Sequence, residues 1–208
     1  MVIQELKPSK RVEGRWLAVL EDGSILRLGE EEILTFALYA GRELTEEEAQ
    51  ALQSSTHLRA LKEKALELLS RKPQSRRELE RKLADWEAGE EEIQTICRRM
   101  EELGFLNDAS YAAQVVRYYS AKSYGEKKLR DELYRRGIPR ELWSDALEQA
   151  VSPESVLDEF LRRKLAGREA DAAQLKKVSD ALARRGYSWG EIRDALHRYG
   201  AETGDWDG

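Results

Sequence analysis

The pattern of apolar and polar positions divides the chain into two parts that differ in kind. Within the first 57 residues, two short apolar runs with β-branched and aromatic members occupy positions 15–20 and 25–28. Asp22-Gly23 lies between them, and Asp-Gly tolerates the positive φ angles of a tight hairpin turn. The pattern predicts a β-hairpin at about 12–28.

Two helix signals follow the predicted hairpin. Residues 30–40 show a helical pattern that we expect to end near Gly41. Thr45-Glu46-Glu47-Glu48 has the spacing of a capping box, in which Thr45 and Glu48 bond the free amides at a helix start. Residues 1–57 are therefore predicted to form a small extension, a hairpin plus helix. A hairpin alone is marginally stable in water, so it needs a helix to pack against.

From Leu58 onward, apolar residues recur every three or four positions, as on one side of a helix. Tyr111, Val115 and Tyr119 show this spacing clearly. We predict nine helices, at about 58–70, 76–87, 90–103, 109–121, 125–136, 139–150, 153–166, 169–185 and 189–198. Residues 75–78 and 188–191 have the capping-box spacing, and each box opens one of these helices. The nine helices group into three-helix units at 58–107, 108–151 and 152–200, followed by a flexible tail at 201–208.

The three units are copies of one repeat. Gly89, Gly137 and Gly186 are 48 and 49 residues apart, and residues 133–138 closely match residues 182–187. We expect each glycine to end a helix in the left-handed conformation. Such small units must share apolar surface with their neighbours. The predicted fold class is mainly α, an elongated array of three tandem three-helix repeats with the N-terminal β-hairpin and helix extension.

Charge is abundant but nearly balanced. Charged residues make up 36% of the 208 residues, and the net charge is −5. Residues 1–57 carry six Lys/Arg against eleven Asp/Glu, whereas residues 58–150 carry nineteen against eighteen. A dedicated duplex-DNA binder normally has a basic excess, so any nucleic-acid contact must come from local clusters. We also expect a cytoplasmic location, because the sequence shows no membrane span, no signal peptide and a lone cysteine.

Candidate catalytic chemistry is sparse. His57 and His197 lie far apart and lack metal-ligand spacing, and Cys97 falls on the apolar side of a predicted helix, where we expect it to be buried. No glycine-rich loop joins a strand to a helix as phosphate binding requires. We expect no enzyme, no cofactor and no metal.

Basic clusters recur at equivalent positions of the repeats. One interpretation is a solvated face with cations near helix C-termini, where the helix dipole favours them. The other is a positive stripe that binds an acidic partner or nucleic acid, with Tyr118 or Tyr124 able to stack on bases. The candidate partner-binding residues are Arg76, Arg77, Arg81, Lys82, Lys122, Lys127, Lys128, Arg130, Arg135 and Arg136.

The junction of the first two copies carries a family resemblance. Residues 103–108 read Leu-Gly-Phe-Leu-Asn-Asp, and residues 125–138 fit Gly-x-x-x-Leu-x-x-Glu-Leu-x-x-Arg-Gly-Ile. With the Ser-x-x-Glu-Leu at 75–79, the sequence closely resembles the RecX family of recombinase regulators. The resemblance implies a monomeric protein that binds the RecA filament, and the single-stranded DNA within it. It also implies inhibition of ATP hydrolysis, strand exchange and co-protease activity.

Two other functions fit the helical pattern. Three-helix units with short turns can mimic helix-turn-helix domains, which would make the protein a DNA-binding regulator, although no unit has a concentrated basic recognition helix. A general helical-repeat scaffold for another protein is the second alternative.

Overall fold

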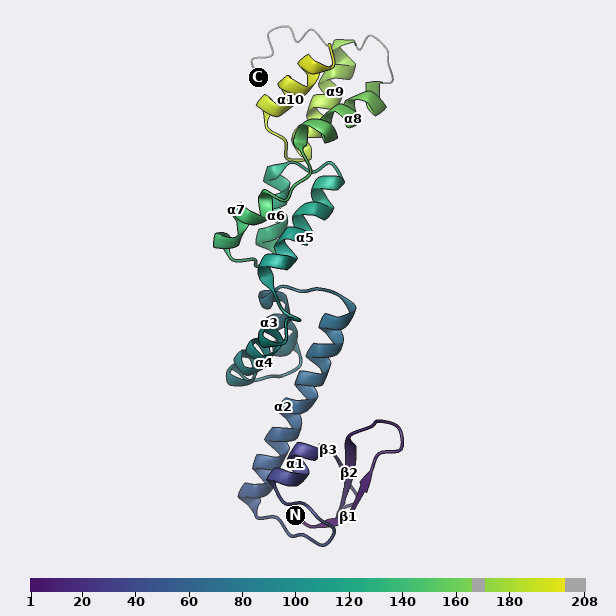
Figure 1. Cartoon of the computed structure of the whole chain (residues 1–208), viewed down its shortest axis with the longest axis vertical. Helices are drawn as coiled ribbons and strands as arrows, with labels where there is room; N and C mark the ends of the chain where they lie inside the picture. Colours follow the sequence, from purple (N-terminus) through teal and green to yellow (C-terminus); the bar gives the residue numbers. More distant parts are fainter. Residues whose placement is uncertain (166–170, 201–208) are drawn as a thin grey trace. The chain divides into compact units, whose positions relative to one another are not determined.

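The computed structural model describes residues 1–165 and 171–200, and confirms a mainly helical fold with a small N-terminal sheet (Figure 1). It divides into two compact units. The first comprises residues 1–70 and 83–98, and the second comprises residues 71–82 and those from 99 onward. The predicted tail at 201–208 and the predicted helix start at 169 lie outside the described residues.

The N-terminal sheet has three antiparallel strands in the order β1 (Ile3–Pro8), β2 (Arg15–Leu20) and β3 (Ile25–Gly29). Strands β2 and β3 confirm the predicted hairpin, and Gly23 in its turn has a φ of +80°. Strand β1 was not predicted. It is mostly polar, with only one buried residue, because pairing with β2 rather than its own apolar pattern holds it in the sheet.

The helices that follow the sheet differ in length from the prediction. Helix α1 (Glu30–Thr35) ends before residue 40, because Ala37 adopts a φ of +47° and the Leu38 amide bonds back to the Ile33 carbonyl. Helix α2 (Glu46–Arg71) is one element of 26 residues, so the prediction of a new helix at residue 58 is wrong. No proline or glycine interrupts the sequence there.

The capping box at the start of α2 is confirmed. The Thr45 amide donates to Glu48 Oε2 at 3.0 Å, and the Glu48 amide donates to Thr45 Oγ1 at 3.2 Å. One turn further along, Leu52 is fully buried in a core that also contains Ala18 and Leu28 of the sheet. The beginning of α2 therefore covers the apolar face of the sheet.

The repeat helices appear largely where the periodicity placed them. The third helix of the second repeat is the main exception. It is split into a 3-10 turn, η1 (Arg140–Leu142), and a short helix α7 (Trp143–Leu147), and thus ends before residue 150. The others are α3 (Arg76–Asp85), α4 (Glu90–Glu102), α5 (Asp108–Ala121), α6 (Glu126–Arg135), α8 (Pro153–Leu165), α9 (Ala172–Arg184) and α10 (Trp189–Arg198).

Two of the three repeat glycines behave as predicted. Gly137 and Gly186 follow α6 and α9 with φ angles of +67° and +90°. The prediction for Gly89 is wrong: it precedes α4, and its amide donates to Glu92 Oε2 at 2.9 Å. The equivalent turn position in the first repeat is Glu87, a non-glycine residue with a φ of +64°. The two extra residues in this copy shifted the expected register.

Candidate partner-binding surface

The second helix of the first repeat begins at a buried serine. The Ser75 amide donates to Glu78 Oε2 at 2.9 Å and the Glu78 amide donates to Ser75 Oγ at 3.0 Å, which confirms the capping box. The Ser75 side chain is fully buried, and its hydroxyl donates a third hydrogen bond to the backbone carbonyl of Arg136. The turn after α6 is thus bonded to the N-terminus of α3. Both segments belong to the second unit.

A second joint of the same design links the next two repeats. The Gly125 amide, at the N-cap of α6, donates to the Arg185 carbonyl at 2.9 Å. The Lys127 amide donates to the Gly186 carbonyl at 3.3 Å. In both joints an Arg-Gly turn of one repeat therefore lies against the start of the second helix of the repeat before it.

The glycines of these turns are also needed because the backbones approach closely. A Cβ on Gly137 would lie 2.6 Å from Cβ and Cγ of Arg77, and one on Gly186 would lie 2.6 Å from the Lys128 amide nitrogen. Distances under 3 Å cannot be accommodated without movement. Glu87 occupies the corresponding turn of the first repeat and is exposed. The residues before this repeat form the sheet extension, so its turn has no earlier repeat to pack on.

Arg136, one of the predicted binding residues, is engaged inside the second repeat. Its guanidinium donates to the hydroxyls of Tyr111 at 3.2 Å and Tyr119 at 3.3 Å, and it pairs with Glu132. Burial alone would lower the pKa of Arg136, but these bonds outweigh it and raise the pKa. Arg136 therefore helps to fix α6 against α5.

Arg185 occupies the matching place in the third repeat. Its guanidinium donates to the carbonyls of Lys122 at 3.0 Å and Ser123 at 3.4 Å, just after α5. The same group lies 5.0 Å from the Phe160 ring centroid. It thus satisfies carbonyl groups at a helix C-terminus and joins the second and third repeats.

Arg76 is likewise engaged by neighbouring groups. Its amide donates to Asp108 Oδ1 at 2.8 Å, and its guanidinium contacts Glu101 at 2.6 Å and Glu80 at 3.1 Å. Burial raises the pKa of Asp108, and the Arg76 amide offsets only part of that effect. Arg76 connects α3 to α4 and α5.

The other predicted residues are more accessible, and several of them lie in surface ion pairs. Arg130 pairs with Glu126 at 2.6 Å, Arg135 with Glu132 at 2.8 Å, and Lys128 with Asp131 at 3.9 Å. The pairs of Arg130 and Lys128 are exposed on both sides and contribute at most about 1 kcal/mol, so a partner can displace them. Those with exposed side chains are Arg77, Arg81, Lys82, Lys122, Lys127, Arg130 and Arg135, and Lys128 is partly exposed.

One exposed aromatic was missed by the sequence interpretation. Tyr134 is 68% exposed on α6, four residues after Arg130 and seven after Lys127. Residues at these spacings share one side of a helix, so the spacing could have identified it. Tyr124, by contrast, packs against the core of the second repeat.

Reactive and metal-binding groups are sparse in residues 1–165 and 171–200, which the structure describes. The buried position predicted for Cys97 is confirmed. Within these ranges, no group of three or more His, Cys, Asp or Glu residues is arranged to hold a metal ion. No helix in the described part of the chain is both long and apolar enough to cross a membrane.

Comparisons with known proteins agree with the repeat structure. Models of the first, second and third three-helix domains of RecX match residues 62–100, 107–147 and 154–196. The regulatory protein RecX of Pseudomonas fluorescens is 37% identical over 139 residues, 66% of this chain and 90% of that protein. That of Leptothrix cholodnii is 33% identical over 138 residues, 66% of this chain and 87% of that protein.

Two solved structures share the fold. The crystal structure of a regulatory protein RecX superposes with a TM-score of 0.73 at 22% identity, covering 94% of this chain and 98% of that one. RecX from Lactobacillus salivarius gives a TM-score of 0.60 at 24% identity, covering 70% and 98%. With three domain models matched in order along the chain, and relatives covered over most of their length, this protein belongs to the RecX family of regulatory proteins.

Proposed function

We propose that the protein is a negative regulator of RecA that binds the RecA–single-stranded DNA filament. In this proposal it inhibits the ATPase, strand-exchange and co-protease activities of the filament. The observation that carries the proposal is the match of all three RecX domains to consecutive segments of the chain. RecX membership fits a RecA regulator and a protein that acts by binding.

The exposed cations of α3 and α6 are the proposed contact surface. Lys127, Arg130 and Tyr134 lie on one side of α6, where the cations can meet phosphates or carboxylates and the ring can stack. Arg76 and Arg136 support this surface indirectly, because their contacts hold α3 and α6 in place. Because the first two repeats are nearly neutral overall, binding through local clusters of cations is favoured over nonspecific attraction to DNA.

The direct test is RecA-catalysed ATP hydrolysis on single-stranded DNA with the protein titrated in. We expect hydrolysis to fall as the protein approaches the stoichiometry of filament sites. Unchanged hydrolysis and unchanged filament length at that stoichiometry would refute the proposal. Tight, sequence-dependent duplex binding in gel shifts, without any effect on RecA, would support the helix-turn-helix alternative instead.

A further inference from the structure

The cations of the N-terminal extension gather in one place. Residues 1–57 contain six Lys/Arg, and five of them line a single hollow of about 590 Å³. They are Lys7, Lys10, Arg11, Arg15 and Arg27. Among the described residues, no carboxylate lines this hollow, although the same segment carries eleven. We refer to it as the N-terminal hollow.

Strand register places these cations together. Lys7 on β1, Leu17 on β2 and Arg27 on β3 are cross-strand partners in one row. The adjacent residue of β2, Ala18, is fully buried in the core, so alternation turns the row to the opposite face of the sheet. Adjacent strands are about 4.8 Å apart, which separates Lys7 and Arg27 by about 10 Å at the backbone.

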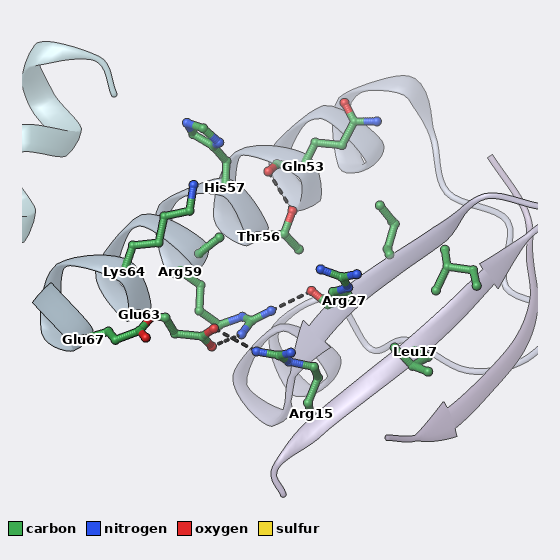
Figure 2. A pocket seen from close by; sticks show the side chains of 13 residues that line it. Arg15, Leu17, Arg27, Gln53, Thr56, His57, Arg59, Glu63, Lys64 and Glu67 are labelled. Carbon is green, nitrogen blue, oxygen red and sulfur yellow. Dashed lines mark hydrogen bonds and ion pairs between the residues drawn. The ribbon is translucent and has the colours of Figure 1, made fainter. Parts of the chain in front are cut away.

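The N-terminal hollow continues into a second cleft of about 860 Å³ between β3 and α2, which shares Arg15, Leu17 and Arg27 (Figure 2). There the positive charge is compensated. Arg15 pairs with Glu63 at 3.0 Å, and Arg59 donates to the Arg27 carbonyl at 2.6 Å while it also pairs with Glu63.

The other cations that line the N-terminal hollow are not compensated in this way. Lys7 pairs with Glu5 at 2.7 Å, but both side chains are about half exposed. The side chains of Lys10, Arg11 and Arg27 form no ion pair within the residues that the structure describes. These three cations therefore keep their full capacity to bind an anionic group.

We propose that the N-terminal hollow is a docking site for an acidic segment of a protein partner. Carboxylates of the segment bind Lys10, Arg11 and Arg27, and an apolar side chain of the segment packs on Leu17 and on Val12, which is 40% exposed. This site goes beyond the proposed action on RecA and does not rest on it.

The charge distribution favours a short peptide over nucleic acid. Screening is weak within about 8 Å at physiological salt, so a long polyanion would also meet the carboxylates of the extension. Glu30, Glu31, Glu46 and Glu47 supply four exposed ones close to the sheet in sequence. The aromatic side chain of β2, Trp16, packs against the core, so it is not presented for base stacking on the open face. A short acidic segment needs only Lys10, Arg11 and Arg27.

Fluorescence anisotropy with the full chain tests this site. The probe is a labelled peptide that alternates glutamate and leucine and is long enough to cross three strands. One control peptide has glutamine in place of glutamate, and one control ligand is a labelled oligothymidylate. The test variant is Lys10→Glu with Arg27→Glu. Its matched control is Lys62→Glu with Arg98→Glu, which makes the same charge change on α2 and α4, outside both clefts.

We expect the acidic peptide to bind more tightly than the glutamine peptide, with an affinity that falls as salt rises. The test variant should weaken binding about tenfold or more, and the matched control less than about twofold. Equal binding of the two peptides, or equal loss in both variants, would overturn the site. Tighter binding of the oligothymidylate that the test variant abolishes would assign the hollow to nucleic acid and also overturn the proposal.

Discussion

The hydroxyl of Ser75 donates to the backbone carbonyl of Arg136, sixty-one residues away, while it accepts a hydrogen bond from the Glu78 amide. One buried side chain thus begins helix α3 and holds the turn after α6. The equivalent joint between the second and third repeats uses the backbone of Gly125 against Arg185. The repeats of the second unit are therefore connected by hydrogen bonds.

The first prediction concerns the glycine of each joint. Gly137→Ala and Gly186→Ala should destabilise the protein for two reasons, the positive φ and the steric overlap at 2.6 Å. The φ effect alone costs about 1–2 kcal/mol, and we expect the total to exceed about 3 kcal/mol. Urea unfolding followed by circular dichroism measures the difference.

Gly104→Ala is the matched control for that prediction. Gly104 also has a positive φ, +75°, but a Cβ there would meet nothing within 4 Å. Its substitution by alanine should lower the free energy of unfolding only by the cost of the positive φ. Equal losses at Gly104 and Gly137 would show that close approach between repeats contributes nothing.

A second prediction concerns the two hydrogen bonds made by the Ser75 hydroxyl. Ser75→Ala removes the cap of α3 and the bond to Arg136, so it should cost about 2 kcal/mol or more. Ser188→Ala removes a comparable capping box at the exposed start of α10 and should cost about 1 kcal/mol. The comparison uses the free energy of unfolding of each variant, and a smaller loss at Ser75 than at Ser188 would contradict the joint.

The sequence predicted features that local chemistry determines. The hairpin turn at Gly23 and the capping boxes at Thr45, Ser75 and Ser188 depend on neighbouring residues, and all are confirmed. The cap at Ser75 revealed only half of that residue's role, because its bond to the second repeat depends on tertiary structure.

Features that depend on distant segments escaped prediction. Strand β1 is held by pairing, and Glu87 takes the turn position assigned to Gly89 because its turn meets no earlier repeat. The predicted partner-binding residues also included both exposed arginines and arginines that are bonded within the repeat. Arg135 and Arg136 are adjacent in the sequence, yet only the structure shows that Arg136 faces Tyr111 and Tyr119 while Arg135 is exposed. The gathering of cations in the N-terminal hollow required the register of all three strands.

The third prediction is a pH dependence at Glu132. Burial would raise the pKa of this carboxyl, but hydrogen bonds from Arg135 and Arg136 outweigh it and lower the pKa below its usual 4.5. The resulting stability is present above about pH 4.5 and is lost as pH falls through the lowered pKa of the folded state. Glu132→Gln should therefore lower the free energy of unfolding by about 1 kcal/mol at pH 7, and by less as the pH approaches 3.

Unfolding of the wild type and this variant across the acid range measures that difference, in which other titrating groups cancel. Glu102→Gln is the control, because Glu102 pairs with Arg99 where both side chains are 54% exposed. A difference at Glu132 that does not change with pH would mean that the lost interaction is packing and not charge.

The fourth prediction concerns a buried hydroxyl. Ser179 on α9 is 1% exposed, and its Oγ has no hydrogen-bond partner among the described residues. Ser179→Ala should raise the free energy of unfolding by up to about 1 kcal/mol, because an unpaired polar group no longer has to be buried. Ser120→Ala should lower it, since Ser120 Oγ donates to the Arg117 carbonyl and accepts from the Val151 amide. Destabilisation of both variants to the same degree would contradict this reasoning.

The last prediction tests the contact surface proposed for α6. Lys127→Glu with Arg130→Glu reverses two exposed cations on one side of the helix and leaves Lys128, whose side chain lies against Gly186, in place. The free energy of unfolding should change by less than about 1 kcal/mol, because exposed charges contribute little to stability. Binding to RecA filaments should weaken about tenfold or more and lose part of its salt dependence.

Two controls make that result specific. Lys62→Glu with Arg98→Glu changes the net charge equally on α2 and α4 and should leave filament binding within about twofold. Leu133→Ala should reduce the free energy of unfolding by about 2–5 kcal/mol, because it leaves a cavity at a fully buried side chain. This variant should still inhibit the RecA filament at temperatures below its own unfolding temperature. The α6 variant should bind the filament weakly at these temperatures too, because it lacks charge at the interface and not stability. Unchanged binding of the α6 variant at low and high salt would remove Lys127 and Arg130 from the contact surface.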